Sequence, residues 1–190
     1  MPFMFIAGSL PLDFTNTVSW HTGPEPYDHL QTAQDLADWA GQAAIPAPVG
    51  TPDTLAAARA LREALFCTFL AVANESSPES GDLELVNGHL RVAMGHAQLT
   101  PDLAWGWDDE SSPDVVLWTI ARQGADLLAS PDLRAVSVCQ ADNCGWLFLD
   151  RRHLRRWCTK EGCGNRAKAA RHYQRVKARR EAGTSSQDDG

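Results

Sequence analysis

Apolar residues recur at spacings of three and four along most of the first 132 positions, which is the pattern of amphipathic helices. Four of these stretches begin at a hydroxyl side chain suited to capping a first helical turn, at Thr32, Thr51, Ser77 and Ser112. A proline follows each of the last three, at a position that helices tolerate. The sequence therefore predicts a domain built mainly from helices, whose apolar faces form its core.

Shorter segments differ from this helical pattern. Residues 97–107 are typical of a small hairpin, because a Thr-Pro-Asp turn separates two short apolar stretches. Further along, residues 134–138 and 145–150 are each typical of a short strand, and residues 155–158 are the candidate partner of the second one. Asn165 is a suitable N-cap for a last helix. A small β-containing unit is thus expected after the helical domain.

The cysteines are concentrated in this second unit. Cys139 and Cys144 form one pair, and Cys158 and Cys163 form a second pair with the same spacing of four intervening residues. Turn-forming residues inside each loop allow two sulfur atoms to point at one place, as a tetrahedral Zn²⁺ site requires. We favour one structural zinc ion over an iron–sulfur cluster, two disulfides or four unrelated thiols. The fifth cysteine, Cys67, lies among apolar residues and is expected in the core.

The order of elements indicates the fold class. We predict a mainly α chain with a helical N-terminal domain over residues 1–132 that includes a small β-hairpin. A treble-clef-like zinc finger with four cysteine ligands, a short β-hairpin and a basic helix follows over residues 133–182, and residues 183–190 form a disordered tail. Because so short a finger has little core of its own, metal binding would supply much of its stability.

Charge is distributed unevenly along the chain. The net charge of −7 over 190 residues argues, taken alone, against nucleic acid and anionic membranes as partners. Residues 1–138, however, carry a net charge of −13, whereas residues 139–182 carry +8. This uneven distribution of charge indicates that the chain has two parts with different roles. No apolar stretch approaches the ~18 residues of a membrane span and no signal peptide is recognisable, so we expect a cytoplasmic protein without membrane contacts.

Several motifs resemble known families. The sequence Cys163-Gly164-Asn165-Arg166, together with the patterns at 139–150 and 171–173, is similar to the CGNR zinc-finger family. Residues 8–17 and 61–65 resemble the ABATE domain that is usually found with this finger. The resemblance covers nearly the whole chain. It implies a bacterial transcription regulator whose finger binds DNA, and it implies no enzymatic reaction.

The basic residues of the second unit are the candidate nucleic-acid contacts. Lysine and arginine neutralise phosphates, and arginine also forms paired hydrogen bonds with guanine in the major groove. On the last helix we expect the cationic residues on one face, and Ala169, Tyr173 and Val176 packed against the finger. Charge compensation of the zinc thiolates, a solvated surface, and an adaptor that docks on a protein partner or on the acidic domain are the alternatives. The candidates are Arg151, Arg152, Arg155, Arg156, Arg166, Lys168, Arg171, Arg175, Lys177 and Arg179.

The first domain offers a candidate input site. Asp13, Asn16 and Thr17 are polar residues in an apolar segment, and their spacing places them on one face of a helix. We consider a small-molecule effector pocket there, with helix capping or satisfaction of buried backbone groups as the alternative. A homodimer is a further hypothesis.

An enzyme is the contrasting functional class. The chain contains no Gly-rich phosphate loop, no Gly-x-Ser-x-Gly nucleophile motif and no His-Glu-x-x-His metal motif. A zinc ion held by four cysteines is structural, because it has no open position for a substrate. We therefore expect a zinc-dependent DNA-binding transcription regulator rather than an enzyme.

Overall fold

The computed structural model of the chain describes residues 3–184 and the side chains as far as Lys177. The side chain of Arg179 and residues 185–190 of the predicted tail lie outside the described residues. The elements in chain order are α1 (Leu10–Thr15), β1 (Val18–Ser19), β2 (Tyr27–Asp28), α2 (Ala33–Gln42), α3 (Pro52–Ala73), α4 (Ser80–His96), β3 (Ala97–Leu99), β4 (Trp105–Trp107), α5 (Val115–Leu128), the 3-10 turn η1 (Pro131–Ala135), β5 (Val136–Val138), β6 (Leu147–Leu149), the π-helical turn η2 (Lys160–Gly164) and α6 (Asn165–Thr184).

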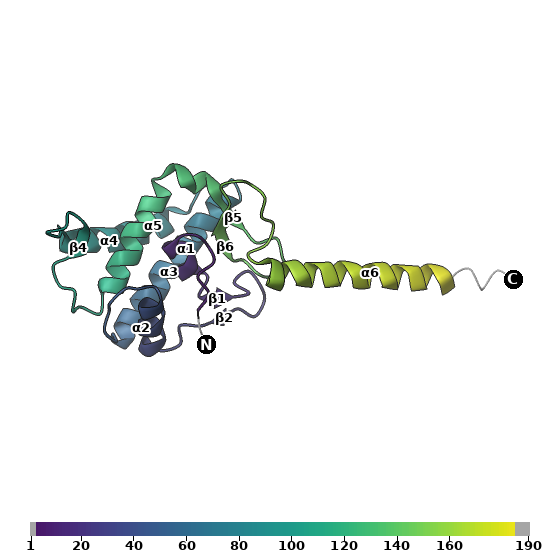
Figure 1. Cartoon of the computed structure of the whole chain (residues 1–190), viewed down its shortest axis with the longest axis horizontal. Helices are drawn as coiled ribbons and strands as arrows, with labels where there is room; N and C mark the ends of the chain where they lie inside the picture. The colour runs from purple at the N-terminus through teal and green to yellow at the C-terminus, as the bar shows by residue number, and fades with distance from the viewer. Residues whose placement is uncertain (1–2, 185–190) are drawn as a thin grey trace.

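Helices α3, α4 and α5 form the centre of a helical body, and α1 packs against α3 and α5 (Figure 1). Leu61, Leu65 and Phe69 of α3 are fully buried between these helices. Gly124 lets α5 approach closely, because a Cβ atom there would lie 2.8 Å from a methyl group of Leu65. Cys67 is exposed, which corrects the expectation of a core position: its side chain points away from the face formed by the other three residues of α3.

Two of the four predicted helix starts follow the sequence signals, whereas α5 begins at Val115 after Asp114 rather than after Ser112. Thr32 and Asp35 form the expected reciprocal capping box at α2, and Thr51 forms one with Thr54 at α3. The third start is different, because α4 begins at Ser80 rather than after Ser77. Residues 76–79 have no regular secondary structure, and the N–H of Ser76 still donates to the carbonyl of Ala71 at the end of α3. Among the described residues, no helix has both the length and the apolar character needed to cross a membrane.

The strands form three small antiparallel sheets: β1 with β2, β3 with β4, and β5 with β6. The predicted hairpin over residues 97–107 is confirmed, with Ala97 opposite Trp107. The predicted pairing in the finger is wrong, because β6 pairs with β5 rather than with residues 155–158. The first cysteine loop thereby becomes the turn of the β5–β6 hairpin, which places both of its thiols at one end of that hairpin.

The finger hairpin is joined to the helical body by hydrogen bonds across the free edge of β6. The side chain of Asn16, just after α1, accepts from the N–H of Leu147 at 2.9 Å and donates to its carbonyl oxygen at 2.8 Å. The N–H of Leu149 donates to the carbonyl of Ala7 at 2.7 Å. Leu147 and Phe148 also belong to the same buried cluster as the core of the body. The finger and the helical body therefore share one core.

Candidate metal centre and nucleic-acid interface

Four cysteine sulfur atoms meet where the β5–β6 hairpin approaches the start of α6. The Sγ atoms of Cys139, Cys144, Cys158 and Cys163 all lie within 4.8 Å of one another, and all four residues are buried. Three of the Sγ–Sγ distances are 3.4, 3.5 and 3.8 Å. A tetrahedron with zinc–sulfur bonds of ~2.3 Å has edges of about 3.8 Å. The donor set and its geometry therefore suit one structural zinc ion held by four cysteines.

Two tight loops deliver these sulfur atoms. In the first loop, the N–H of Cys139 donates to the carbonyl of Trp146 at 2.8 Å, which closes the turn. Gly145 adopts a positive φ of 69°, a conformation that glycine reaches without a steric penalty. In the second loop, the hydroxyl of Thr159 accepts from the N–H of Gly162 at 3.0 Å and caps η2. The matched spacing of the two cysteine pairs thus produces two tight turns that converge on one point, as the sequence predicted.

The electrostatics of the cluster favour a bound cation. Hydrogen bonds from Cys144 and Cys158 lower the pKa of Cys139, whereas the hydrogen bond to Cys139 raises the pKa of Cys144. Four neighbouring thiols do not ionise together unaided, and a divalent cation supplies the charge that allows all four thiolates to form. Arg166 adds a further positive charge, because its Nη2 donates to the Sγ of Cys163 at 2.9 Å. Arg166 therefore supports a metal ligand directly, beyond the surface role predicted for it.

Two of the predicted DNA-contacting arginines are engaged within the fold. The guanidinium of Arg151 forms a two-point ion pair with the carboxylate of Asp132, at 3.0 and 2.5 Å. The Nη2 of Arg155 donates to the carbonyl of Cys158 at 2.6 Å, and its guanidinium lies 4.1 Å from the ring centre of Phe148. Arg155 thus holds the loop that carries a metal ligand, which is a structural task.

Arg156 lies at the rim of a groove between the first cysteine loop and α6. Its Nε donates to the side-chain oxygen of Gln140 at 2.9 Å, and its guanidinium lies 5.4 Å from the ring centre of Trp157. Sequence reasoning did not select Gln140 or Trp157; the one local signal was an aromatic residue directly after a run of arginines. The groove has a volume of about 400 Å³ and is lined by Gln140, Ala141, Asp142, Arg156, Trp157, Arg166, Ala167, Ala170, Arg171 and Gln174.

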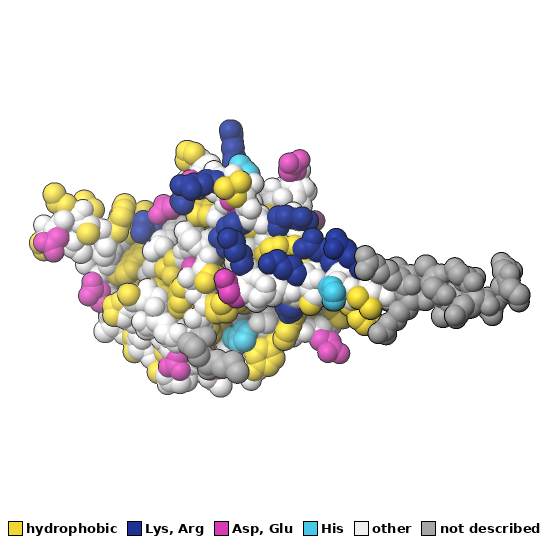
Figure 2. Space-filling model, turned by 45° about the vertical axis from the view of Figure 1, so that its right-hand side comes forward, with side chains coloured by type: hydrophobic (Ala, Val, Ile, Leu, Met, Phe, Trp, Pro, Cys, Tyr) yellow, Lys and Arg dark blue, Asp and Glu magenta, His cyan; other side chains and the backbone are white. Residues whose placement is uncertain are grey.

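The remaining basic residues face solvent. Within the part of the chain that the structure describes, Arg152, Lys168 and Arg175 are exposed and form no ion pair. Arg171 is also exposed, and its Nε donates only to a carbonyl of its own helix at 3.2 Å. Lys177 is exposed further along the same helix. Figure 2 shows dark blue side chains gathered where α6 leaves the body. We call Arg152, Lys168, Arg171 and Arg175 the basic surface.

Helix α6 extends away from the body, with its later turns standing clear of it (Figure 1). The expectation that Ala169 and Tyr173 pack on the finger is wrong, because Ala169 is exposed and Tyr173 is 70% exposed. The apolar residues of the finger, such as Leu147 and Phe148, pack against the helical body instead, so α6 is not needed to cover them. A helix of 20 residues forms a rod of about 30 Å.

The three residues considered for an effector pocket are buried and engaged. The carboxylate of Asp13 accepts two backbone N–H groups at 2.8 Å, and burial raises its pKa. Asn16 makes the two hydrogen bonds to Leu147 described above. The hydroxyl of Thr17 accepts from Arg62 at 3.2 Å. This geometry matches the alternative of satisfying buried polar groups, and it gives the pocket hypothesis no support at these residues.

Comparison with known families agrees with this architecture. A family model described as "ABATE: Putative stress-induced transcription regulator" matches residues 8–131. The model of the CGNR zinc finger matches residues 136–176, which include all four cysteines of the cluster. Comparison with curated proteins gives no match for this chain. Since the first match alone covers well over half of the chain, the protein belongs to the ABATE family and carries a CGNR zinc finger after that domain.

Proposed function

We propose that this protein is a zinc-dependent regulator of transcription that binds duplex DNA through its basic surface and α6. The family description as a regulator of transcription supports the general role. The single observation that carries DNA contact is the projection of an exposed, arginine-bearing helix from the zinc cluster. The proposed role is binding rather than catalysis, and it places the protein in the cytoplasm with the bacterial chromosome.

The geometry of α6 suits the major groove. A helix with its side chains is about 10–12 Å wide, and the major groove of B-DNA is ~12 Å wide. Lys168, Arg171 and Arg175 follow one another at spacings of three and four residues, so they share one face of the rod. Arg152 lies outside α6, and its exposed side chain adds a contact from the loop after β6. Such an arrangement provides phosphate contacts on one side of a helix that enters the groove.

The zinc cluster fixes the N-terminal end of α6. Cys163 lies in η2, which leads directly into α6, and Arg166 in the first turn of α6 donates to its sulfur. A metal bound to the four cysteines would therefore hold the helix start in one orientation relative to the body. Without the metal, the start of α6 would lose this fixed orientation. DNA affinity should therefore depend on zinc, although none of the residues of the basic surface binds zinc.

The test is a fluorescence anisotropy titration of the zinc-loaded full chain with a labelled DNA duplex at several salt concentrations. Four phosphate contacts predict a slope of about −3.6 in the log–log plot of affinity against salt, so affinity falls roughly 150-fold between 50 and 200 mM. The triple variant Lys168→Gln, Arg171→Gln, Arg175→Gln should flatten the slope by about 2.7. Arg91→Gln, an exposed arginine on α4, is the matched control and should leave the slope unchanged.

Two results would refute DNA binding by this surface. One is the absence of any binding at low salt with zinc fully loaded. The other is an unchanged slope in the triple variant, which would place the phosphate contacts elsewhere on the chain.

A protein-binding adaptor is the second candidate. It is favoured by two exposed apolar side chains beside the basic surface, Leu154 at 77% and Tyr173 at 70% exposure. Docking of α6 on the chain's own acidic body finds no support, because α6 points away from that body (Figure 1). Salt dependence separates the two functions, because a contact made by these apolar side chains changes little between 50 and 200 mM salt, whereas duplex affinity falls roughly 150-fold. A small-molecule effector and a homodimer also stay proposals.

A further inference from the structure

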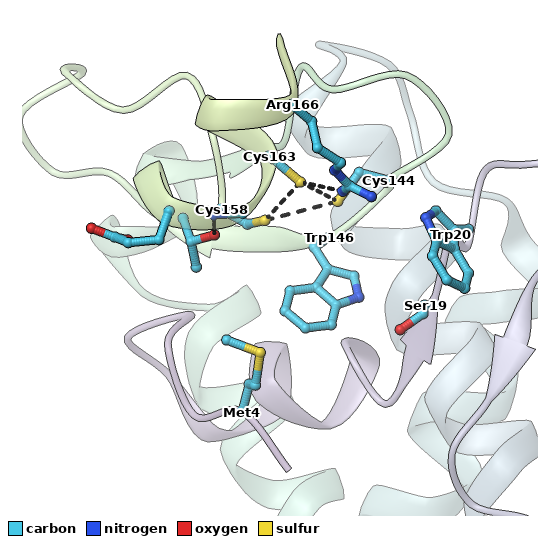
Figure 3. Close-up of a pocket in the computed structure, with 11 residues that line it drawn as sticks. Met4, Ser19, Trp20, Cys144, Trp146, Cys158, Cys163 and Arg166 are labelled. Atoms are coloured by element: carbon cyan, nitrogen blue, oxygen red, sulfur yellow. Dashed lines mark hydrogen bonds between the residues drawn. The ribbon is translucent and has the colours of Figure 1, made fainter. Parts of the chain in front are cut away.

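A second hollow lies between the first 20 residues of the chain and the zinc finger. It has a volume of about 360 Å³, near the lower end for small-molecule sites. Its walls include Met4 and Trp20 from the N-terminal segment, Trp146 from the hairpin and Arg166 from α6 (Figure 3). Three of the four cluster cysteines, Cys144, Cys158 and Cys163, also line it. The hollow is therefore formed jointly by the ABATE domain and the finger.

The backbone at Trp20 is held in a conformation that leaves its indole accessible. Trp20 is 46% exposed and adopts a positive φ of 53°, which is uncommon for a bulky residue. Its neighbours hold it there: the carbonyl of Trp20 accepts from the N–H of Gly23 at 2.8 Å, and the N–H of His21 donates to the carbonyl of Cys144 at 3.2 Å. A strained residue held by its surroundings is a feature of binding sites. The indole of Trp20 is thus displayed at the hollow rather than packed away.

Trp146 forms a second prepared wall. Its Nε1–H donates to the carbonyl of Val18 at 2.7 Å, which satisfies the one polar atom of the ring and sets its orientation. The exposed part of the indole is then apolar. Met4, which is 49% exposed, lies on the far side of Trp146 from Arg166 in the view of Figure 3. Two indoles and a thioether therefore provide a surface suited to the face of a flat ring.

Arg166 is the cationic residue among those that line the hollow. Arg166 uses Nη2 for the sulfur of Cys163, and the structure gives no other hydrogen-bond partner to its guanidinium among the described residues. The nitrogen atoms that remain can donate to an acceptor placed in the hollow. Glu161 is the acidic group of the lining and is exposed, so it is screened by solvent. A single carboxylate at these nitrogen atoms has a cationic partner, whereas a second negative group would face the cysteine sulfur atoms without one.

We propose that this hollow binds a small planar aromatic molecule that carries a single carboxylate. The ring lies against Trp20 and Trp146, and the carboxylate accepts hydrogen bonds from Arg166. A ligand in this position touches both the ABATE domain and the finger, and it covers the side of the metal cluster formed by three sulfur atoms. This gives the chain an input site distinct from Asp13, Asn16 and Thr17, and it does not depend on DNA as the partner.

The binding test is an isothermal titration of the zinc-loaded full chain with 2-naphthoate. We expect saturable binding of one molecule per chain, and at least tenfold weaker binding of the uncharged analogue 2-naphthalenemethanol. Trp20→Ala should weaken naphthoate binding at least tenfold, whereas Trp105→Ala, a similarly exposed tryptophan on β4, should change it less than twofold. Absence of saturable binding, or equal effects of the two tryptophan variants, would overturn the proposal.

A second pair of variants guards against a folding defect in Trp20→Ala. Met4→Glu places a carboxylate at the exposed edge of the hollow and should abolish naphthoate binding, while Met94→Glu on α4, at a similar exposure, should not. Saturating naphthoate should also slow the transfer of zinc to a chelator at least threefold in the unmodified chain, because the ligand covers the sulfur atoms. Unchanged binding in Met4→Glu, or an unchanged zinc transfer rate, refutes this location. None of these experiments contains DNA, so a negative result in them would not count against the proposed DNA binding.

Discussion

The amide of Asn16 links the ABATE domain to the finger, and its removal tests whether the two unfold as one unit. Its two hydrogen bonds, at 2.9 and 2.8 Å, satisfy both backbone groups of Leu147, a residue 131 positions away that is fully buried. Asn16→Ala leaves a buried N–H and a buried carbonyl without a partner. Each such group costs about 1–3 kcal/mol, so the expected loss is about 2–6 kcal/mol.

The assay is thermal and urea unfolding of the zinc-loaded chain, followed by circular dichroism and by tryptophan fluorescence. A loss of about 4 kcal/mol lowers Tm by roughly 8–16 °C for a chain of this size. Asn87→Ala is the control, because Asn87 is exposed on α4 and its replacement by alanine should change stability by less than ~0.5 kcal/mol. Both probes should report a single transition that shifts together.

Two outcomes would refute this reasoning about Asn16. Equal stability of Asn16→Ala and Asn87→Ala would mean that water replaces the amide at little cost. Two separate transitions, with only the later part of the chain affected, would mean that the finger and the body unfold independently and that their shared core is not cooperative.

Three further predictions concern the cluster and the body. Cys158→Ser should lower zinc content from one ion per chain towards zero in a colorimetric assay and abolish DNA binding; full zinc retention would contradict the four-cysteine site. Gly145→Ala should weaken zinc binding, because φ is 69° and the added Cβ would lie 3.0 Å from the backbone N of Thr22; competition with a chelator measures this, and unchanged affinity would contradict it. Arg62→Met should destabilise the chain by about 2 kcal/mol in urea, since it removes the buried partner of the Asp28 carboxylate at 2.7 Å and leaves only Arg59 beside that carboxylate, at 3.2 Å; a loss below ~1 kcal/mol would count against the Arg62 ion pair.

The metal site could be predicted because its signal is local. Each cysteine pair lies within six residues, and the turn residues between the thiols restrict the loop enough to direct both sulfur atoms to one point. The starts of α2 and α3 were predictable for the same reason, since Thr32 and Thr51 bond to backbone groups three residues away. Strand pairing within the finger was not predictable, because residues 136–138 and 155–158 are both near enough to reach β6.

The roles of the basic residues depended on distant neighbours. Arg151 is paired because Asp132 lies beside it in space, and Arg155 is held by Phe148 and a carbonyl of the metal loop. No periodicity in the sequence separates these two from Arg152 and Arg175, which stay exposed. The sequence around Asn16 was likewise ambiguous. A buried amide can bond to a neighbouring strand, as that of Asn16 does, or to a ligand, and the local sequence is the same in both cases.

The sequence by itself determined the mainly helical class, the four metal ligands and the separation of an acidic part from a basic one. Helix periodicity, capping and loop closure act over a few residues, so they can be recognised without a fold. Only the tertiary structure decided that the finger shares its core with the body, that α6 extends away from it, and that Trp20 and Trp146 line one hollow beside the sulfur cluster. These features depend on hydrogen bonds and burial between residues far apart in the chain, such as Asn16 and Leu147 with 131 positions between them, which no local pattern specifies.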